Sequence, residues 1–213
     1  IENDGNPTQL EKGLRQIGFT SADITVMIDT HLHFDHAGGN TYIEGGRSDD
    51  EIEPDQVAIS FPNATYYVQR GEWEYAHWQN ERIQASYLPY NFDPIHAAGL
   101  LELVEGDQEI VPGVSVMRTP GHTPHHQSVI IRSAGEAAIF LADVMPTSAH
   151  LPLPWIMGYD VEPLVTLESK RAIVSRAKEE DWLLIFEHDP VVAWGRLDQN
   201  DKKLSLVRAD ESG

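Results

Sequence analysis

The chain has 213 residues, of which 34 are acidic and 15 are basic, and it contains no cysteine. A formal charge of −19 opposes binding to a polyanion, so we expect no nucleic-acid partner. The absence of cysteine excludes disulfides and thiolate ligands and leaves His, Asp and Glu as the strong metal ligands. The length suits one large domain or two small ones. No apolar run approaches the ~20 residues of a membrane-spanning helix, so we expect no membrane partner, with a cytoplasmic location as the default.

The first predicted element is a short amphipathic helix. Thr8 and Glu11 have the spacing of a capping box, apolar residues then recur at helical intervals, and Gly18 provides a C-terminal stop. Residues 24–28 follow as a β-branched, apolar run, which predicts a strand that is buried on both faces.

Residues 31–36, HLHFDH, supply three imidazoles and one carboxylate close to the end of this strand. These groups suit a borderline-soft divalent metal such as zinc. The glycines at 38 and 39 allow the backbone to bend sharply and to approach a ligand closely. A histidine-rich surface loop is the alternative, but such a loop has no need of Leu32 and Phe34, which we expect to turn into apolar packing.

The middle of the chain is predicted to alternate between regular elements and loops. The acidic residues 44–55 indicate an exposed loop, residues 65–68 a strand, and residues 70–80 the start of a helix. Prolines and aromatic residues within 86–99 indicate an irregular segment that crosses the surface.

Short apolar runs separated by turn-forming residues predict an antiparallel meander in the second half of the chain. Its strands are expected at residues 101–104, 114–117, 128–131 and 137–141. A helix with one buried side follows over residues 163–179. Its apolar positions are Leu164, Leu167, Ile173, Val174 and Ala177. A buried strand at 182–186 and a last strand at 191–194 precede a polar tail.

Three further polar residues lie, like the histidine cluster, at the ends of predicted strands. His122 follows the strand at 114–117, Asp143 follows the strand at 137–141, and His188 follows the strand at 182–186. Strands that each deliver a metal-competent side chain at one end provide a rigid frame for a metal site.

Together these motifs resemble those of the metallo-β-lactamase superfamily. HLHFDH at 31–36, GHT at 121–123, Asp143 and EHD at 187–189 occur in that family's order, and the match runs over about residues 8–194. The resemblance implies an α/β (α+β) fold, a four-layer αββα sandwich. The resemblance further implies a single domain over residues 1–213. That family opens with several strands before its first helix, whereas this chain begins with an isoleucine close to the first helix, so we expect the domain to be incomplete at its N-terminus, either because those strands were removed or because the fold is trimmed.

The resemblance also implies two divalent metal ions, with zinc expected and manganese, iron or cobalt as alternatives. The implied ligands are, for the first ion, His31, His33 and His122; for the second, Asp35, His36 and His188; and for both, Asp143. Two ions about 3.5–4 Å apart can hold a bridging hydroxide with a pKa near 7, which is a nucleophile for hydrolysis. Asp35 is then a candidate to carry a proton to the leaving group.

Individual residues narrow the branch of the family. His33 stands where the oxygen-reducing di-iron members have a glutamate, and the lack of cysteine excludes the second metal site of many β-lactamases. The chain therefore looks like the dinuclear lactonases and the glyoxalase-II-like thioesterases, and we expect it to hydrolyse a small carboxylic ester, lactone or thioester. The alternatives are a phosphodiesterase or nuclease of the same family and a metal-binding regulatory protein without turnover.

The segment after Asp143 is expected to overhang the site. Within it, His150 is a candidate to contact the small-molecule substrate, which makes it the second catalytic candidate beside Asp35. The apolar residues in 151–157 indicate either the wall of a substrate pocket or the interface of a homodimer. His125 and His126 either support the site or simply enter the next strand.

Overall fold

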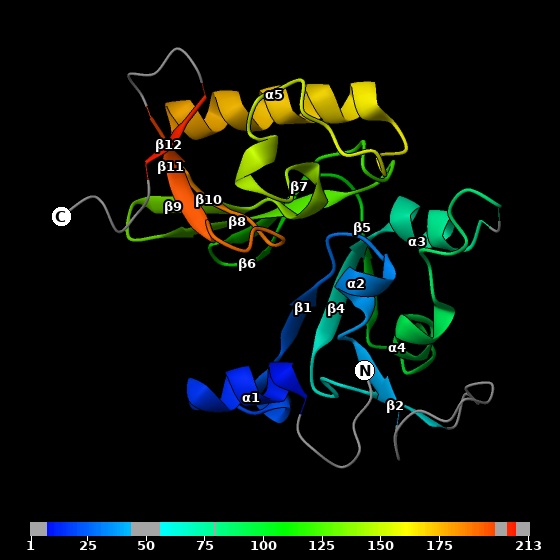
Figure 1. The fold of residues 1–213 in the computed structure, drawn as a ribbon. Coiled ribbons are helices and arrows are strands. Elements are labelled where there is room, and N and C mark those ends of the chain that lie inside the picture. The colour runs from blue at the N-terminus through cyan, green and yellow to red at the C-terminus, as the bar shows by residue number, and fades with distance from the viewer. Residues whose placement is uncertain (1–7, 44–55, 79, 199–203, 208–213) are drawn as a thin grey trace. The chain divides into compact units, whose positions relative to one another are not determined.

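The computed structural model describes residues 8–43, 56–78, 80–198 and 204–207 (Figure 1), so the loop predicted at 44–55 lies outside the described residues. The chain divides into two compact units, an N-terminal unit of residues 1–104 and a C-terminal unit of residues 105–213. Each unit combines helices with a β-sheet, which confirms the predicted mixture of α and β structure. Among the described residues, no helix has the length and the apolar character needed to cross a membrane.

The N-terminal unit is built on a three-stranded parallel sheet in the order β1-β4-β5. Its strands are β1 (Val26–Ile28), β4 (Thr65–Gln69) and β5 (Leu101–Val104). Parallel neighbours need a crossover connection, which between β4 and β5 contains α3 (Arg70–Ala76), η3 (Pro89–Asn91) and α4 (Asp93–Ala97). The short helices at 89–97 correct the expectation that residues 86–99 are irregular throughout. Prolines at the start of both helices misled that prediction, although proline is well tolerated in the first turn.

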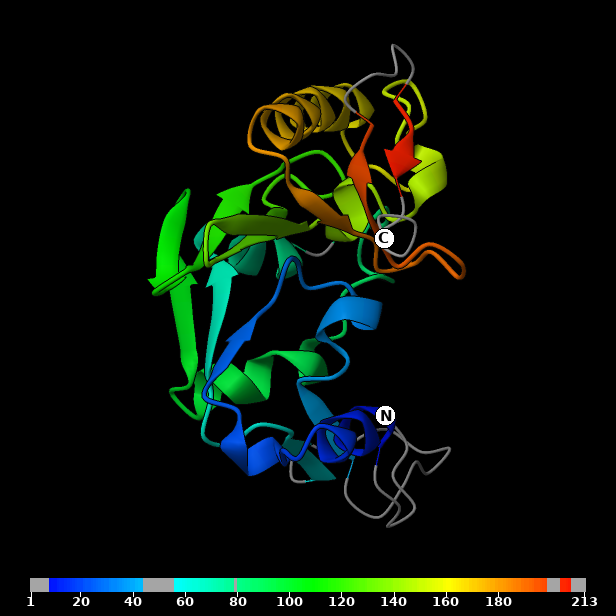
Figure 2. The ribbon, with the colours of Figure 1, turned by 90° about the vertical axis from the view of Figure 1, so that its left-hand side faces the viewer.

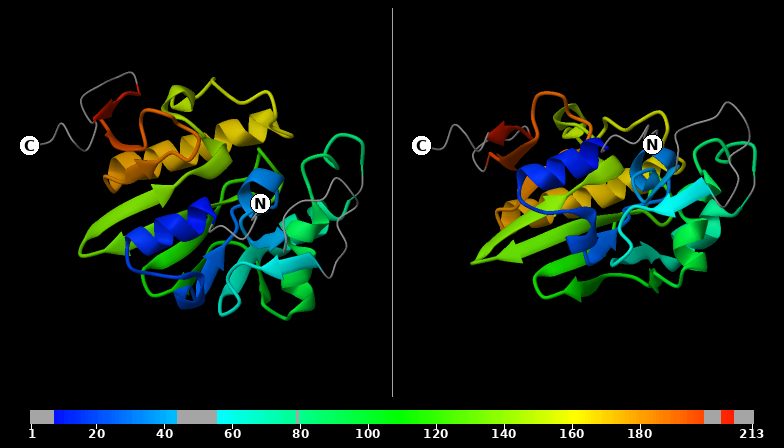
Figure 3. Two further views of the ribbon diagram at one scale, coloured as in Figure 1. Left: turned by 60° about the horizontal axis from the view of Figure 1, so that its bottom comes forward. Right: turned by 90° about the horizontal axis from the view of Figure 1, so that it is seen from below.

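The remaining elements of this unit flank the sheet. Helix α1 (Gln9–Gln16) begins with the predicted capping box, in which Thr8 and Glu11 exchange hydrogen bonds of 2.7 and 3.1 Å. The short helices η1 (Ser21–Asp23) and α2 (Phe34–Ala37) lie before and after β1. Strands β2 (Thr41–Ile43) and β3 (Val57–Ile59) form an antiparallel pair, and α4 packs against β3, as the views in Figure 3 show.

β1 differs from the prediction in its burial. All three of its residues are half-buried, so the expectation of a strand buried on both faces was wrong. The reason is its place at an edge of the sheet, where β4 is its one partner strand among the described residues. One apolar cluster of this unit instead surrounds β4 and α4, and its buried residues are Phe61, Ala64, Tyr66 and Ile95.

The C-terminal unit is built on a seven-stranded sheet in the order β12-β11-β10-β9-β8-β7-β6. Its strands are β6 (Gln108–Val111), β7 (Val114–Arg118), β8 (Gln127–Ser133), β9 (Glu136–Phe140), β10 (Leu183–Ile185), β11 (Trp194–Leu197) and β12 (Leu206–Val207). Strands β6 to β9 form the predicted antiparallel meander. Two corrections apply: residues 101–104 belong to the other sheet, as β5, and the first strand of the meander is β6, which sequence analysis missed.

Helix α5 (Pro163–Glu179) has the predicted bounds and lies along one face of this sheet (Figure 2). It connects β9 to its parallel neighbour β10 and thereby supplies the crossover that a parallel pair requires. The C-terminal half of its buried face joins the apolar core through Ile173, Val174 and Ala177. Leu164, expected on the buried side, is 77% exposed.

Polar residues occupy the N-terminal half of the buried face of α5. Thr166, Ser169 and Lys170 are buried there. A pattern based on apolar residues cannot identify these positions, which explains why Leu164 was misplaced. The last predicted strand, at 191–194, lies further along the chain as β11, and the tail adds β12 to the edge of the sheet.

Candidate active site

The histidine cluster of the N-terminal unit occupies the turn between β1 and α2 and the start of α2. The ring centroids of His31 and His33 lie 4.5 Å apart, and those of His31 and His36 lie 4.0 Å apart. The carboxylate of Asp35 lies 3.7 Å from Nε2 of His36. Three imidazoles and one carboxylate therefore gather within a few ångströms, a donor set that fits a divalent metal ion.

The two apolar residues inside this cluster behave differently. Leu32 is fully buried, as predicted, whereas Phe34 is 51% exposed, so the prediction that Phe34 packs inward was wrong. Phe34 begins α2, and its backbone N–H donates a hydrogen bond of 2.8 Å to the carbonyl of Ser86. The backbone of Phe34, rather than its side chain, fixes this part of the loop.

A buried carboxylate on α3 also holds the loop, and sequence analysis missed it. Oε1 of Glu72 accepts hydrogen bonds from the backbone N–H of Leu32 at 3.1 Å and from the hydroxyl of Tyr87 at 2.8 Å. Because β1 and β4 are parallel neighbours, the loop after β1 and the helix after β4 meet at the same edge of the sheet. Burial, and then the charge of Glu72, raises the pKa of Tyr87 far above its usual range, so the hydroxyl remains a donor.

A second buried carboxylate connects the two sides of the loop. Oδ2 of Asp29, just before the histidines, accepts a hydrogen bond of 2.9 Å from the side-chain amide of Asn40, just after them. Burial raises the pKa of Asp29 to about 7, against the opposing effects of Asn40 and of the charge on His36. Next to Asp29, the hydroxyl of Thr30 lies 3.2 Å from Nδ1 of His31. The histidine loop is thus fixed at both ends by hydrogen bonds.

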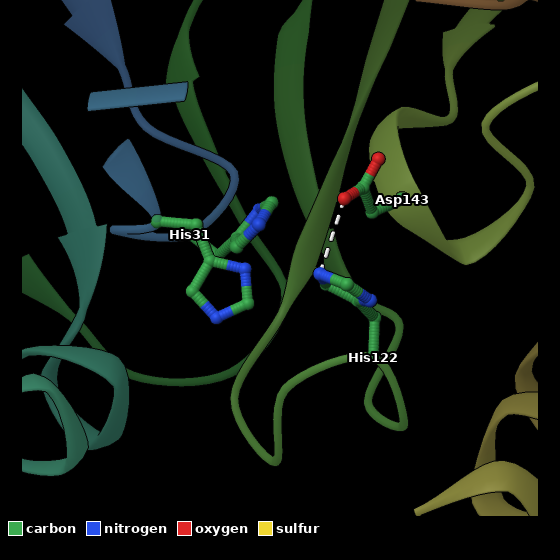
Figure 4. A group of neighbouring side chains, drawn as sticks. His31, His122 and Asp143 are labelled. Carbon is green, nitrogen blue, oxygen red and sulfur yellow. Dashed lines mark ion pairs between the residues drawn. The ribbon is translucent and has the colours of Figure 1, made fainter. Parts of the chain in front are cut away.

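In the C-terminal unit the predicted ligands come from three strands that run in the same direction. β7 and β9 are each antiparallel to β8, and β10 is parallel to β9, so the C-terminal ends of β7, β9 and β10 lie at one edge of the sheet. His122, Asp143 and His188 follow these three ends. Oδ2 of Asp143 lies 3.1 Å from Nε2 of His122 (Figure 4), and its Oδ1 lies 3.2 Å from Nε2 of His188.

Two unusual backbone conformations place these side chains. Ala142 has a φ of 48°, in the left-handed region, and turns the chain after β9 so that Asp143 follows at once. Gly121 has a φ of 137°, and a Cβ at this position would lie 2.3 Å from the backbone nitrogen of Thr166. Glycine adopts a positive φ without strain, whereas the left-handed conformation of Ala142 is strained and persists because the surrounding structure enforces it, as often happens at functional sites.

Asp160 is a supporting residue that sequence analysis missed. Its Oδ1 lies 3.0 Å from Nδ1 of His122, and its Oδ2 accepts a hydrogen bond of 2.7 Å from the hydroxyl of Thr166. Metal-binding histidines commonly donate the N–H of the second ring nitrogen to a carboxylate in this way, which fixes the tautomer and the orientation of the ring. The only sequence signal was an acidic residue shortly before the start of α5.

Asp189, the residue after His188, supports the site through four hydrogen bonds. Its Oδ2 accepts hydrogen bonds from the backbone N–H of Ser148 at 2.8 Å and from the Ser148 hydroxyl at 2.5 Å. Its Oδ1 accepts from the N–H groups of Val191 and Val192 at 2.9 and 2.7 Å. Burial raises the pKa of Asp189, but these hydrogen bonds outweigh burial and hold the pKa well below its usual range. The turn that carries His188 is thereby joined to the turn that carries His150.

His150 lies at the end of η5 (Ser148–His150), beyond η4 (Ala142–Val144). Its Nδ1 lies 2.8 Å from the hydroxyl of Thr147. Burial and then the nearby charge of Lys170 lower the pKa of His150, which favours a neutral imidazole, while the charges of Asp160 and Asp143 oppose this shift.

The histidines after His122 also have defined places. His126 is fully buried, and its Nδ1 lies 2.8 Å from the hydroxyl of Thr119. This contact closes the loop that carries His122 onto the start of β8, so His126 supports the loop, whereas His125 is half-buried.

The predicted ligands divide between the two units. His31, His33, Asp35 and His36 belong to the N-terminal unit, and His122, Asp143 and His188 belong to the C-terminal unit. The structure brings together the members of each set. Their joint binding of metal remains a prediction.

Comparison with known proteins identifies relatives of this chain. The family model described as "Metallo-beta-lactamase superfamily" matches residues 4–188. The N-acyl homoserine lactonase AiiA of Bacillus thuringiensis subsp. kurstaki is 32% identical over 180 residues, which are 83% of this chain and 60% of that relative. This chain therefore spans less than two thirds of the length of that relative.

Solved structures agree with the family match. A structure described as a probable metal-dependent hydrolase from Staphylococcus aureus has a TM-score of 0.81 at 26% identity, covering 95% of this chain and 69% of that one. AidC, a dizinc quorum-quenching lactonase, has a TM-score of 0.74 at 18% identity, covering 97% of this chain and 73% of that one, and supports the fold alone. These matches confirm the predicted fold class, and the chain belongs to the metallo-beta-lactamase superfamily.

Proposed function

We propose that this chain is a metal-dependent lactone hydrolase with a site for two divalent ions, most readily zinc. One observation carries the proposal. The carboxylate of Asp143 lies between His122 and His188, with one oxygen near Nε2 of each, at 3.1 and 3.2 Å. A carboxylate with its two oxygens directed to two different imidazoles is suited to join two metal ions, each of which takes one imidazole.

The donor set fits zinc-type ions because it contains only imidazoles and carboxylates. We assign His31, His33 and His122 to the first ion, Asp35, His36 and His188 to the second, and Asp143 to both. When bound, the ions would lower the pKa of water and polarise the substrate carbonyl.

Residues of the chain orient the metal ligands and transfer a proton to the leaving group. Asp160 and Thr166 hold the ring of His122, so that its Nε2 keeps a fixed direction. Opening a lactone breaks the acyl C–O bond, and the departing alkoxide needs a proton. We assign this proton transfer to Asp35, whose side chain is 43% exposed and therefore exchanges protons with solvent. To His150, on η5, we assign a contact with the substrate.

The relatives guide the choice of lactone. Because the related enzyme at 32% identity is an N-acyl homoserine lactonase, N-acyl homoserine lactones are the first substrates to test. These molecules carry no charge, so the formal charge of −19 does not repel them. A phosphodiester, which is an anion, meets that repulsion.

Metal content and turnover measured on one sample test the proposal. We expect about two zinc or similar ions per chain by elemental mass spectrometry, and hydrolysis of N-hexanoyl homoserine lactone that is lost on chelation and restored by zinc. His122→Ala is expected to lose both metal and turnover. The matched control is His96→Ala, which removes an exposed histidine from α4.

Each contrary outcome has a distinct meaning. Metal binding without hydrolysis of any lactone, ester or thioester would favour the non-catalytic alternative. Faster hydrolysis of a phosphodiester than of any lactone would favour the phosphodiesterase. Unchanged metal content and turnover in His122→Ala would contradict the ligand assignment itself.

A further inference from the structure

The buried face of α5 contains a lysine that the reaction outlined above does not use. Lys170 is fully buried. Its Nζ donates hydrogen bonds to three backbone carbonyls, those of Pro152 at 2.9 Å, Leu153 at 3.1 Å and Trp155 at 2.7 Å. An ammonium group has three donors, so all of them are used within one short stretch of chain.

The stretch that receives these hydrogen bonds has little structure of its own. Residues 151–162 contain neither helix nor strand. No helix or sheet supplies hydrogen bonds here, so each buried backbone polar group of this stretch needs another partner. A local hydrogen bond from the N–H of Trp155 to the carbonyl of Pro152, at 3.0 Å, closes a turn, and Lys170 binds the carbonyls of both of these residues.

Burying a charged group destabilises the fold unless the group is well hydrogen-bonded. An apolar side chain at position 170 would avoid this loss of stability. Burial lowers the pKa of Lys170 to about 8, while the charge of Asp160 opposes the shift. The three hydrogen bonds to backbone carbonyls offset the cost of burying the ammonium group. They hold the stretch at a fixed distance from α5.

This stretch continues directly from the turn that carries His150. Leu151, the next residue, is buried in the apolar core, and its N–H bonds to the carbonyl of Ser148 at 3.1 Å. The turn is anchored on its other side by Asp189. Lys170 and Asp189 therefore fix the two ends of the segment 147–155 that carries His150.

We propose that Lys170 is a positioning residue that fixes residues 150–155 against α5 and thereby sets the place of His150 in the active site. The effect on turnover rests on the proposed function. The effect on the segment does not, since it depends only on the three hydrogen bonds.

Hydrogen exchange tests the structural part without any substrate. In Lys170→Met, which keeps the length but removes the donors, we expect the backbone N–H groups of the non-proline residues in 150–157 to exchange about 10-fold faster or more, while the strands β7 to β9 keep their protection. The matched control is Arg171→Met, the neighbouring exposed cation on the same helix, which is expected to change nothing there. If Lys170→Met does not fold, Lys170→Gln retains two donors and is expected to give a smaller increase.

A double-mutant cycle tests the functional part. Lys170→Met is expected to lower kcat for N-hexanoyl homoserine lactone by about 10- to 100-fold with metal content unchanged, and to add little in a His150→Ala background. Fully additive losses would overturn the link to His150. Exchange that stays unchanged at 150–157, or rises equally throughout the unit, would overturn the positioning role. Absence of any lactone hydrolysis in the unaltered chain would contradict the proposed function and leave the exchange result as the test of Lys170.

Discussion

The two units hold their metal-competent residues by different means. In the N-terminal unit the candidates lie within residues 31–36, and supporting bonds reach this one loop from Glu72 and Asn40. In the C-terminal unit, His122, Asp143 and His188 come from three strand ends. Supporting side chains come from equally far along the chain in both units, as Glu72 does for Leu32 and Asp160 does for His122. The units therefore differ in the candidates themselves, which are adjacent in the first unit and are brought together by the sheet in the second.

This difference predicts where substitutions act. A change in the C-terminal unit should disturb the metal-binding groups with limited effect on local folding, since the seven-stranded sheet provides its own core. A change at Glu72 should disturb the conformation of a single loop. The substitutions below test that contrast, beginning with the largest expected effect.

Asp143→Ala is expected to have the largest effect because Asp143 contacts both His122 and His188. Loss of a residue that only supports a ligand typically costs about 10–100-fold in affinity or activity, so loss of this carboxylate should cost more than about 100-fold. Elemental mass spectrometry and lactone turnover check both quantities. Normal metal content in this variant would exclude Asp143 as a shared ligand.

Asp160→Asn is expected to reduce metal affinity by about 10–100-fold while the fold remains intact. The amide keeps the shape of the carboxylate, but it lacks the charge that favours the N–H at Nδ1 of His122. Competition with a chromogenic zinc chelator measures the affinity. Glu168→Gln, on the exposed side of α5, removes a negative charge of the same unit and serves as the control. Equal affinities in the two variants would rule out a role for Asp160 in holding the ligand.

The sequence revealed the candidate metal ligands of both units but not all of the residues that support them. The HLHFDH loop could be identified from the sequence motif alone, because its candidate ligands lie close together in the chain and follow a predicted strand. His122, Asp143 and His188 were found because each ends a strand, a local signal. Asp160 and Lys170 carried no such signal, because their partners are set by the packing of α5 on the sheet.

The same reasoning explains the errors in the fold. Strand β5 has the alternation of a meander strand, yet it pairs with β4, and only the partner distinguishes the two cases. Phe34 looked like a core residue because local pattern does not reveal which side of a short helix faces solvent.

Glu72→Ala tests the single-loop support of the N-terminal unit. It would leave the N–H of Leu32 and the hydroxyl of Tyr87 without this acceptor in a buried setting, at a cost of about 1–3 kcal/mol for each group. Chemical denaturation measures the loss of stability. Glu74→Ala, an exposed position on the same helix, is the control. Matching stability in the two variants would show that Glu72 does not anchor the histidine loop.

The smallest expected effect is a pH dependence of stability that arises from Lys170. Its pKa is about 8 in the folded chain and 10.5 when unperturbed, so between these values the unfolded chain binds more protons than the folded chain. Stability should therefore rise with pH through this window, by about 1 kcal/mol between pH 7 and pH 9. The charges that face Lys170 are Asp160, which favours the ammonium, and His150, which is expected to be neutral at these pH values. Subtracting the profile of Lys170→Met removes the contribution of all other groups that titrate alike in both chains. A flat difference would mean that the ammonium costs the fold nothing, and that the three carbonyls of residues 152–155 compensate its burial in full.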